Sequence, residues 1–299
     1  MYVLMGANGN ITSKAAKLLL SRGAKVRVVG RAAARMKALQ DAGAELAVGN
    51  AQDAGLLAAA FRGATAIYTM IPPDYVSPDH RKYQNAVSEA IAQAIVKSGV
   101  KTVVNLSSVG ASLPGGTGPI AGLHDNEERL NKLDGVNILH LRPAYFMENH
   151  LHAIGLIRAT GVYPAMIAPD APVAMIATRD IAAVVAEELS QPRFKGHTVR
   201  HLLGPRSVTM AEAARVLGAA IGKPDLKYVQ ADPAQAKQGM VAAGFSRNVA
   251  GLFEEMSKAL SDGRINATFA RDAGSAAPTT LESFAKEVFA PAWNAGGAH

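Results

Sequence analysis

The sequence predicts an α/β protein with a doubly wound parallel sheet and a smaller α/β lobe in its C-terminal half. Three observations lead to this prediction. Short β-rich runs alternate with helical stretches, a glycine turn joins the first strand to the first helix, and the regular alternation weakens after about residue 143. Parallel strands buried on both faces need right-handed helical crossovers, which βαβ repetition supplies.

The first βαβ unit predicts a dinucleotide-binding site of the Rossmann type. The strand is followed at once by Gly6-Ala-Asn-Gly9 and an apolar-striped helix. Gly6 permits the tight turn, Gly9 lets a pyrophosphate approach the backbone, and the helix N-terminus supplies free N–H groups. The residues expected to hold the pyrophosphate are Gly6, Asn8, Gly9, Asn10 and Ile11. Thr12 stands where a third glycine would allow close packing, so it implies a wider helix approach or a hydroxyl facing the phosphates.

The residue after the second strand predicts the choice of cofactor. A carboxylate at this position would bind the ribose 2′-hydroxyl of NAD. This chain has Arg31 instead, with Arg35 or Lys37 behind it, and a guanidinium matches a 2′-phosphate. NADP(H) is therefore predicted over NAD(H).

Further strands are predicted over residues 45–48, 66–71, 101–106 and 136–141, with glycines 23, 43, 63 and 99 placed to end the helices between them. Residues 1–143 are expected to form the dinucleotide-binding domain. Residues 144–299 are expected to form a smaller substrate or partner lobe, intertwined with the first. Its helices are predicted near 146–158, 179–190, 209–221 and 246–261, with a strand over 198–203. The glycine-rich loop 113–119 is predicted to be mobile and is a candidate lid.

Composition restricts the class of protein. The 299 residues are 49% hydrophobic and include no cysteine, which excludes disulfides, thiolate nucleophiles and cysteine-based metal sites. The formal charge is +7, but the basic residues are scattered, so direct binding to nucleic acid is not expected. No apolar stretch is long enough to span a membrane, and no leader pattern opens the chain, so a cytoplasmic protein is expected. His150 and His152 are two apart with no third ligand at a familiar spacing, and no metal site is predicted.

An ordered series of motifs closely resembles the NmrA-like branch of the atypical short-chain dehydrogenases. The series consists of Gly6-Ala-Asn-Gly9, Val103-Val-Asn-Leu-Ser107-Ser108, Leu141-Arg142-Pro143 with Met147-Glu148-Asn149, Thr178-Arg-Asp180, and Pro278-Thr-Thr-Leu. The resemblance covers nearly the whole chain and implies a Rossmann domain with a small C-terminal lobe, as a monomer or homodimer. Some members resemble NADPH:quinone or azo-dye reductases, whereas others bind NADP without turnover and act as redox-sensing regulators.

The proton-donating pair of ordinary short-chain dehydrogenases is missing. Those enzymes carry a serine after the fifth strand and a Tyr-x-x-x-Lys pair on the next helix. Here Ser107 and Ser108 occupy the strand end, while His124 and Glu128 stand at the tyrosine and lysine positions. Ser107 and His124 are candidate catalytic residues, and Ser107 is also a candidate cofactor contact. The alternatives are turn serines and a solvent-facing helical pair.

The predicted cleft lining favours a flat hydrophobic acceptor. Met70, Ile71, Pro72 and Pro143 are expected along the cofactor. Tyr145 is a third catalytic candidate and His150 a possible pocket residue, whereas Phe146 and Met147 are interpreted as core. Hydride transfer to a quinone needs mainly positioning and exclusion of water. The sequence therefore predicts an NADPH-dependent oxidoreductase acting on quinones or similar acceptors. The main alternative is a non-catalytic NADP(H) sensor that binds a protein partner, and an isomerase or ether reductase is a third.

Overall fold

The large sheet of the computed structural model has seven parallel strands. The structure describes residues 1–272 and 274–296. The strand order is β10-β6-β5-β4-β1-β2-β3, and every pairing within it is parallel. The strands are β1 (Tyr2–Met5), β2 (Val26–Gly30), β3 (Glu45–Val48), β4 (Ala66–Thr69), β5 (Thr102–Leu106), β6 (Asn137–Pro143) and β10 (His197–Leu202). The order reverses between β1 and β4, and this switch point is where open α/β sheets bind ligands.

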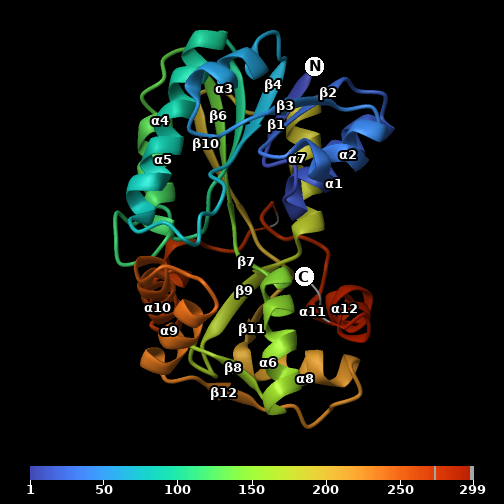
Figure 1. Cartoon of the computed structure of the whole chain (residues 1–299), viewed down its shortest axis with the longest axis vertical. Helices are drawn as coiled ribbons and strands as arrows, with labels where there is room; N and C mark the ends of the chain where they lie inside the picture. The colour runs from blue at the N-terminus through green and yellow to red at the C-terminus, as the bar shows by residue number, and fades with distance from the viewer. Residues whose placement is uncertain (273, 297–299) are drawn as a thin grey trace.

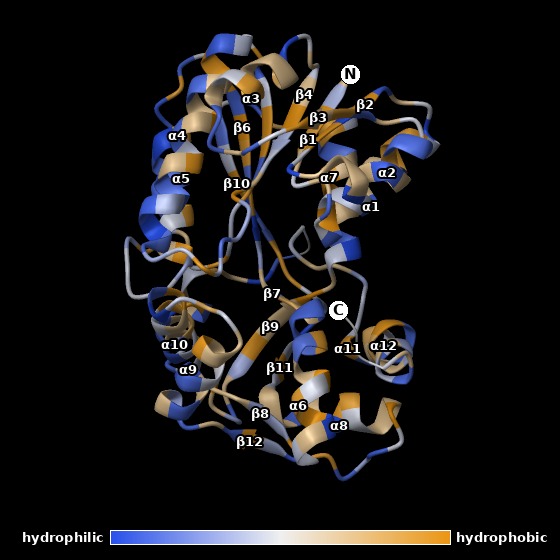
Figure 2. Cartoon of the chain, viewed as in Figure 1, coloured by the Kyte–Doolittle hydropathy of each residue, from blue (hydrophilic) through white to orange (hydrophobic). Residues whose placement is uncertain are grey.

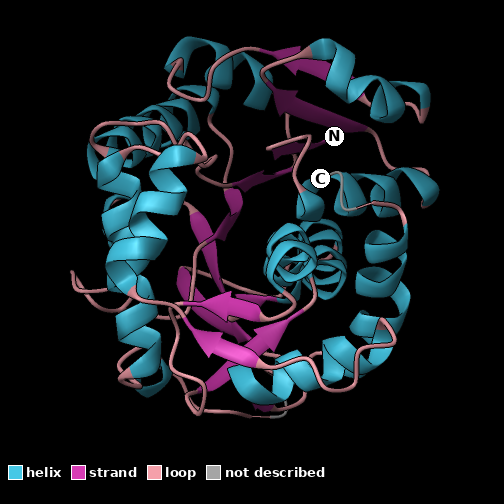
Figure 3. Ribbon diagram, turned by 60° about the horizontal axis from the view of Figure 1, so that its bottom comes forward, coloured by secondary structure: helices cyan, strands magenta, loops and turns pink. Residues whose placement is uncertain are grey.

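Helices cover both faces of this sheet (Figures 1 and 3). One face carries α1 (Asn10–Ser21), α2 (Ala33–Asp41) and α7 (Thr178–Ser190), and the other carries α3 (Ala54–Phe61), α4 (His80–Ser98) and α5 (Ile120–Leu130). The strands alternate accordingly: Leu4 faces the α1 side, whereas Val3 and Met5 face the α3 and α4 side. Figure 2 shows hydrophobic strands between helices whose outer surfaces are hydrophilic. The prediction of a doubly wound Rossmann-type sheet is confirmed.

The C-terminal half builds a second lobe beyond the carboxyl ends of these strands (Figure 1). It contains a three-stranded sheet in the order β11-β9-β7 and the pair β12-β8. Its strands are β7 (Tyr145–Phe146), β8 (Tyr163–Ala165), β9 (Pro172–Ile176), β11 (Ser207–Thr209) and β12 (Tyr228–Gln230). Its helices are η1 (Met147–Ala153), α6 (Ile154–Thr160), α8 (Met210–Ala220), α9 (Pro233–Ala242), α10 (Arg247–Ser261), η2 (Asn266–Thr268), α11 (Leu281–Phe284), η3 (Ala285–Phe289) and α12 (Ala290–Asn294).

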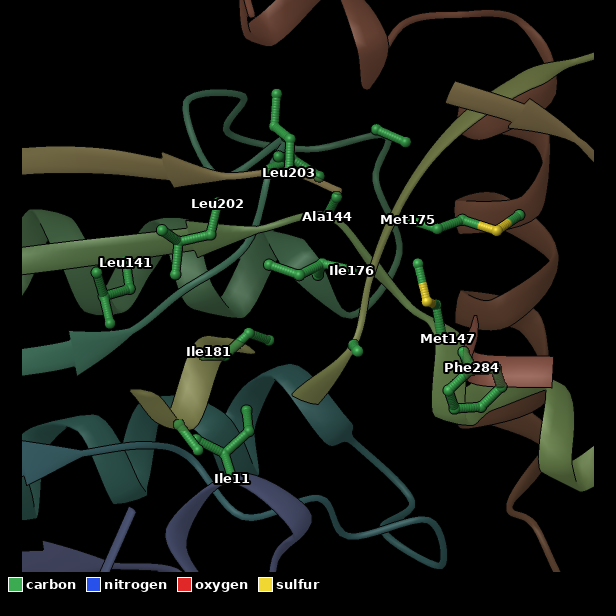
Figure 4. Close-up of a cluster of buried hydrophobic side chains, with 14 of the residues drawn as sticks. Ile11, Leu141, Ala144, Met147, Met175, Ile176, Ile181, Leu202, Leu203 and Phe284 are labelled. Carbon is green, nitrogen blue, oxygen red and sulfur yellow. The ribbon is translucent and has the colours of Figure 1, made fainter. Parts of the chain in front are cut away.

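The chain first leaves the large sheet after Pro143, but it returns to it twice. Helix α7 packs against α1, and β10 pairs along the whole of β6. One continuous hydrophobic core joins the two lobes, and Figure 4 follows it from Ile11 on α1 through Ile176 to Phe284 on α11. The intertwining expected from the sequence thus consists of one helix and one strand from the second half.

The two lobes are also tied by capping side chains. Glu148 in η1 accepts hydrogen bonds from the Thr178 backbone N–H at 3.0 Å and from its hydroxyl, which caps the start of α7. Asp180 accepts from the hydroxyl of Thr279 at 2.8 Å and from its backbone N–H at 3.1 Å. Such caps satisfy polar groups that a helix end would otherwise leave without partners.

The glycine-rich loop 113–119 packs between the lobes. Pro119 O accepts from Gln84 Nε2 at 3.0 Å, and Pro114 O accepts from Arg81 at 3.2 Å. A Cβ atom on Gly118 would lie 2.0 Å from the carbonyl oxygen of Leu252 on α10. The loop therefore bridges α4 and α10 in this structure. No helix in the described ranges is long and apolar enough to cross a membrane.

Candidate active site

The glycine turn lies at the carboxyl end of β1, at the switch point of the sheet. Gly6 has φ +76°, and a Cβ atom on it would lie 2.7 Å from the Sδ of Met70. Gly9 N–H donates to Gly6 O at 2.8 Å, which closes the turn. Gly9 is the N-cap of α1 and offers no side chain to cap it. The first N–H groups of α1 therefore stay available to an anion.

Thr12 turns its hydroxyl toward the strand rather than toward a phosphate. The side chain is buried, and its Oγ1 donates to Met5 O at 2.7 Å. The hydroxyl consequently anchors α1 to the end of β1. Tyr68 of β4 is fully buried, and burial raises its pKa far above the ordinary value.

A cavity of about 230 Å³ opens at this turn. Met70, Pro72 and Pro73 form its wall after β4, and Arg31 stands at its rim after β2. The lining residues are Met5, Gly6, Ala7, Asn8, Gly9, Val29, Gly30, Arg31, Gly49, Ala51, Met70, Pro72 and Pro73. Six residues predicted for the cofactor lie outside this lining, namely Asn10, Ile11, Arg35, Ile71, Ser107 and Pro143. Asn10 and Ile11 belong to the first turn of α1, whereas Ile71 and Pro143 are buried.

Of the four basic side chains near β2, two form ion pairs and two do not, within the part of the chain that the structure describes. Arg27 donates to Glu45 of β3 at 2.7 Å, and Lys37 pairs with Asp41 at 2.8 Å. Arg31 and Arg35 are exposed, and neither forms an ion pair with another residue in the described ranges. The Arg31 guanidinium thus remains available at the cavity, and that of Arg35 lies on the surface outside the cavity lining.

Ser107, at the carboxyl end of β5, is held by a buried ion pair. Its hydroxyl donates to the carboxylate of Glu127 on α5. Glu127 also accepts from Arg142 on β6, through Nη2 at 2.5 Å and Nε at 3.0 Å. Burial alone would raise the pKa of Glu127, but hydrogen bonds from Arg142 and Ser107 and nearby positive charge outweigh it, so this pKa is lowered. The Ser107 proton is therefore directed away from the sheet edge.

His124 and Glu128 do not form the pair that their spacing suggested. His124 is half-buried, and its Nδ1 lies 2.8 Å from Ala111 O. A carbonyl oxygen only accepts, so Nδ1 carries the hydrogen and Nε2 of the neutral ring has a free lone pair. Glu128 is exposed, and its neighbour Glu127 is the buried acid of α5.

A polar network behind this site was not predicted. Asn105 of β5 accepts from Thr69 at 3.1 Å and from Asn126 at 3.0 Å, and its amide nitrogen lies 3.0 Å from His140 Nδ1. His140 Nε2 lies 3.0 Å from Asn131 Oδ1, so the ring is hydrogen-bonded at both nitrogens. Burial lowers the pKa of His140 to about 4. The network links β4, β5, β6 and α5, and its histidine, His140, is neutral at pH 7.

Tyr145 belongs to an aromatic cluster in the second lobe. Its ring centroid lies 5.7 Å from that of His150, and burial raises its pKa to about 12. His150 is fully buried, with Nδ1 at 2.5 Å from the Tyr163 hydroxyl and Nε2 at 3.4 Å from Met175 Sδ. Burial lowers the pKa of His150 to about 4. His150 is thus a satisfied core residue, while Tyr145 is half-buried. In the described ranges, no group of three or more His, Cys, Asp or Glu residues could hold a metal ion.

The switch-point cavity, the uncapped helix and the glycine turn together define a dinucleotide-binding α/β protein. The sequence model of the NmrA-like family matches residues 2–285. The chain belongs to the NmrA-like family, and the resemblance found in its motifs is confirmed.

The relatives and solved structures that the chain resembles include reductases that use NAD(P)H. The NAD(P)H azoreductase of Xenophilus azovorans is 28% identical over 256 residues, which is 86% of each chain. A (4-alkanoyl-5-oxo-2,5-dihydrofuran-3-yl)methyl phosphate reductase of Streptomyces griseus is 30% identical over 75% of each chain. The Citrobacter sp. triphenylmethane reductase complexed with NADP(H) superposes with a TM-score of 0.80 at 19% identity, over 96% of this chain and 99% of that one. An Escherichia coli NADPH-dependent quinone oxidoreductase complexed with NADPH gives a TM-score of 0.77 at 20% identity, over 97% and 100%.

Proposed function

We propose that this protein is an NADPH-dependent oxidoreductase that passes a hydride to a quinone or a similar electron-poor, hydrophobic acceptor. The observation that carries the proposal is the Gly6 to Gly9 turn beside an uncapped α1, with Arg31 at the rim of the same cavity. Relatives named as an NAD(P)H azoreductase and an NADPH-dependent quinone oxidoreductase support it.

The residues present fit a bound NADP(H). Backbone N–H groups of Asn8, Asn10 and Ile11 would hold the pyrophosphate where it approaches Gly9, and Arg31 with Arg35 would hold the 2′-phosphate. Met70, Pro72, Ile71 and Pro143 would border the nicotinamide half. A larger side chain at Gly6 would push Met70 into the cavity, so the glycine fits a cradle that a ligand must enter. When bound, the cofactor supplies a hydride, and reduction of a quinone to a hydroquinone takes that hydride and one further proton.

The chain's own groups would position the acceptor and handle the proton. His124 can donate from Nε2 only as an imidazolium, because Ala111 O occupies its Nδ1 hydrogen. Ser107 directs its proton to Glu127, so it would offer only oxygen lone pairs to the cleft. Tyr145 is protonated at neutral pH, as an ordinary tyrosine is, and burial makes it a weaker acid by raising its pKa to about 12. We infer that water delivers the proton, with His124, Ser107 and Tyr145 as contacts rather than a relay.

The second candidate function is a non-catalytic NADP(H) sensor. It is favoured by the Ser107 to Glu127 hydrogen bond, because the Ser107 hydroxyl, a catalytic candidate at the end of β5, already donates its hydrogen to this carboxylate. Steady-state oxidation of NADPH with a panel of quinones, azo dyes and aldehydes separates the two. Turnover with quinones or dyes supports the oxidoreductase. Tight NADPH binding without turnover on any acceptor favours the sensor. The monomer or homodimer state, the cytoplasmic location and the residue boundaries of the two lobes stay predictions.

A further inference from the structure

Three aromatic rings gather beside the cofactor cavity and play no part in holding a dinucleotide. Tyr75 follows β4, Phe245 precedes α10, and Phe253 lies on α10. The Tyr75 and Phe245 rings are stacked with centroids 5.0 Å apart. Phe253 completes the group at 6.2 Å from each of the other two. We call these three residues the aromatic triad.

Hydrogen bonds fix the triad to the cavity wall. Tyr75 lies two residues beyond Pro73, which lines the cavity. The Ser246 backbone N–H donates to Tyr75 O at 2.9 Å, and the Ser246 hydroxyl donates to Ser77 O at 2.6 Å. Asn248 Oδ1 accepts from the backbone N–H of His80 at 2.9 Å. The start of α10 is therefore held against the loop that leaves the cofactor site.

The triad is not a closed core. Tyr75 is 44% exposed and the adjacent Val76 is 69% exposed, and both phenylalanines are half-buried. Helix α9, which packs against α10, has no buried residue among those described. Aromatic rings that only joined the two lobes would stabilise the fold most if they were fully buried, because the stabilisation grows with the apolar area buried. A solvent-facing aromatic surface beside a cavity is typical of a ligand site.

We infer that the aromatic triad is the surface that binds the hydride acceptor, and that it selects planar aromatic acceptors larger than a single ring. This inference rests on the proposed oxidoreductase function. Planar acceptors stack on aromatic faces, and the free energy of apolar burial grows with the area covered. Tyr75 lies two residues beyond Pro73 of the cavity lining and stacks on Phe245, so an acceptor lying on the triad would lie beside the wall of the cofactor cavity.

The test compares Tyr75→Ala and Phe245→Ala with the ring-preserving Tyr75→Phe and with Val199→Ala, an exposed site on β10. Calorimetry measures binding of 1,4-naphthoquinone to the NADP⁺ complex, which cannot react because it carries no hydride. Steady-state kinetics compare naphthoquinone with the single-ring benzoquinone, and nicotinamide fluorescence gives the Kd for NADPH. We expect both alanine variants to weaken the binding of naphthoquinone, so that its Kd and KM rise roughly threefold to tenfold. This fold-change corresponds to the loss of one aromatic pair. The effect on benzoquinone should be smaller, and both controls should match the wild type.

The outcomes separate this inference from the proposed function. Naphthoquinone Kd and KM unchanged within twofold in both alanine variants would overturn the triad assignment while leaving the oxidoreductase intact. A wild type that binds NADPH but reduces no acceptor would overturn the proposed function, and calorimetry would still decide whether the triad binds naphthoquinone. If Phe245→Ala fails to fold, Phe245→Leu keeps the apolar volume, removes the ring and gives the same decision.

Discussion

The Ser107 hydroxyl donates its hydrogen bond to Glu127, and Glu127 is in turn paired with Arg142 through two guanidinium nitrogens. The arrangement joins β5, α5 and β6 at the carboxyl edge of the sheet. The buried carboxylate of Glu127 therefore holds Ser107 and Arg142 in place, at the position where short-chain dehydrogenases have a catalytic serine.

Loss of Glu127 should therefore cost far more stability than loss of its neighbour. Glu127→Gln leaves the guanidinium of Arg142 buried without a counter-charge, which costs about 3–5 kcal/mol. Glu128→Gln changes an exposed side chain and should stay within about 0.5 kcal/mol of the wild type. Urea unfolding at pH 7 measures both. Equal stabilities for the two variants would contradict the importance of the pair.

Arg31→Ala should weaken NADPH binding much more than NADH binding. A charge-assisted hydrogen bond contributes about 1.5–3 kcal/mol, which corresponds to roughly a tenfold to hundredfold change in Kd. NADH lacks the 2′-phosphate and should lose little. Lys37→Ala is the matched control, because Lys37 is already paired with Asp41. The assignment fails if Arg31→Ala raises both dissociation constants by the same factor.

Gly6→Ala should impair NADPH binding beyond its effect on stability. Gly6 and Gly23 have nearly the same φ, +76° and +77°, so alanine is strained to a similar degree at both positions, by about 1–2 kcal/mol. Only at Gly6 would the new Cβ meet another side chain, Met70; at Gly23 nothing lies within 4 Å. We expect both variants to lose similar stability, and Gly6→Ala alone to raise the Kd for NADPH at least about tenfold, as fluorescence titration would measure. A similar loss of NADPH affinity in Gly23→Ala would show that strain, not the Met70 contact, is responsible.

Acid should destabilise the fold through two buried histidines. Burial lowers the pKa of His140 and of His150 to about 4, while an unfolded histidine titrates near 6.5. Between these pH values the unfolded chain binds more protons, so the free energy of unfolding falls as the pH falls from about 6.5 to about 4. Each histidine contributes up to about 3 kcal/mol over this range.

The measurement is urea unfolding at intervals between pH 7 and pH 4. His150→Phe removes one titrating group and keeps an aromatic ring, so its stability should depend less steeply on pH than that of the wild type. An unchanged slope would mean that His150 is not the buried neutral residue described above.

The strands of the large sheet could be predicted because short apolar, β-rich runs stand out between the helical stretches of the sequence. Residues 45–48 were predicted and observed as a strand, and the strand predicted over 66–71 ends at Thr69. The strands β7, β8, β11 and β12 were missed, since two or three residues carry too little pattern. The five-residue strand β9 was missed as well. Helix α9 was missed as well, because it has no buried face to produce a stripe.

Side-chain partners far apart in sequence could not be predicted. The spacing of His124 and Glu128 placed them on one face of α5, but it did not say which face is buried. A signal was available: Ile120, Leu123, Glu127 and Leu130 form an apolar stripe interrupted by one acid, which indicates a buried, paired charge. The Tyr75 to Phe245 stack had no such signal, because its two rings come from different lobes.

The return of β10 to the large sheet has a consequence for synthesis of the chain. Asn137, at the start of β6, receives a hydrogen bond from Gly196, which is 59 residues later. A ribosome adds ~5–20 residues per second, so β6 waits several seconds as an open sheet edge after it emerges. Open edges invite pairing with other chains. The nucleotide-binding half is therefore unfinished until β10 (His197–Leu202) has been translated, and during that interval the nascent protein is most exposed to aggregation.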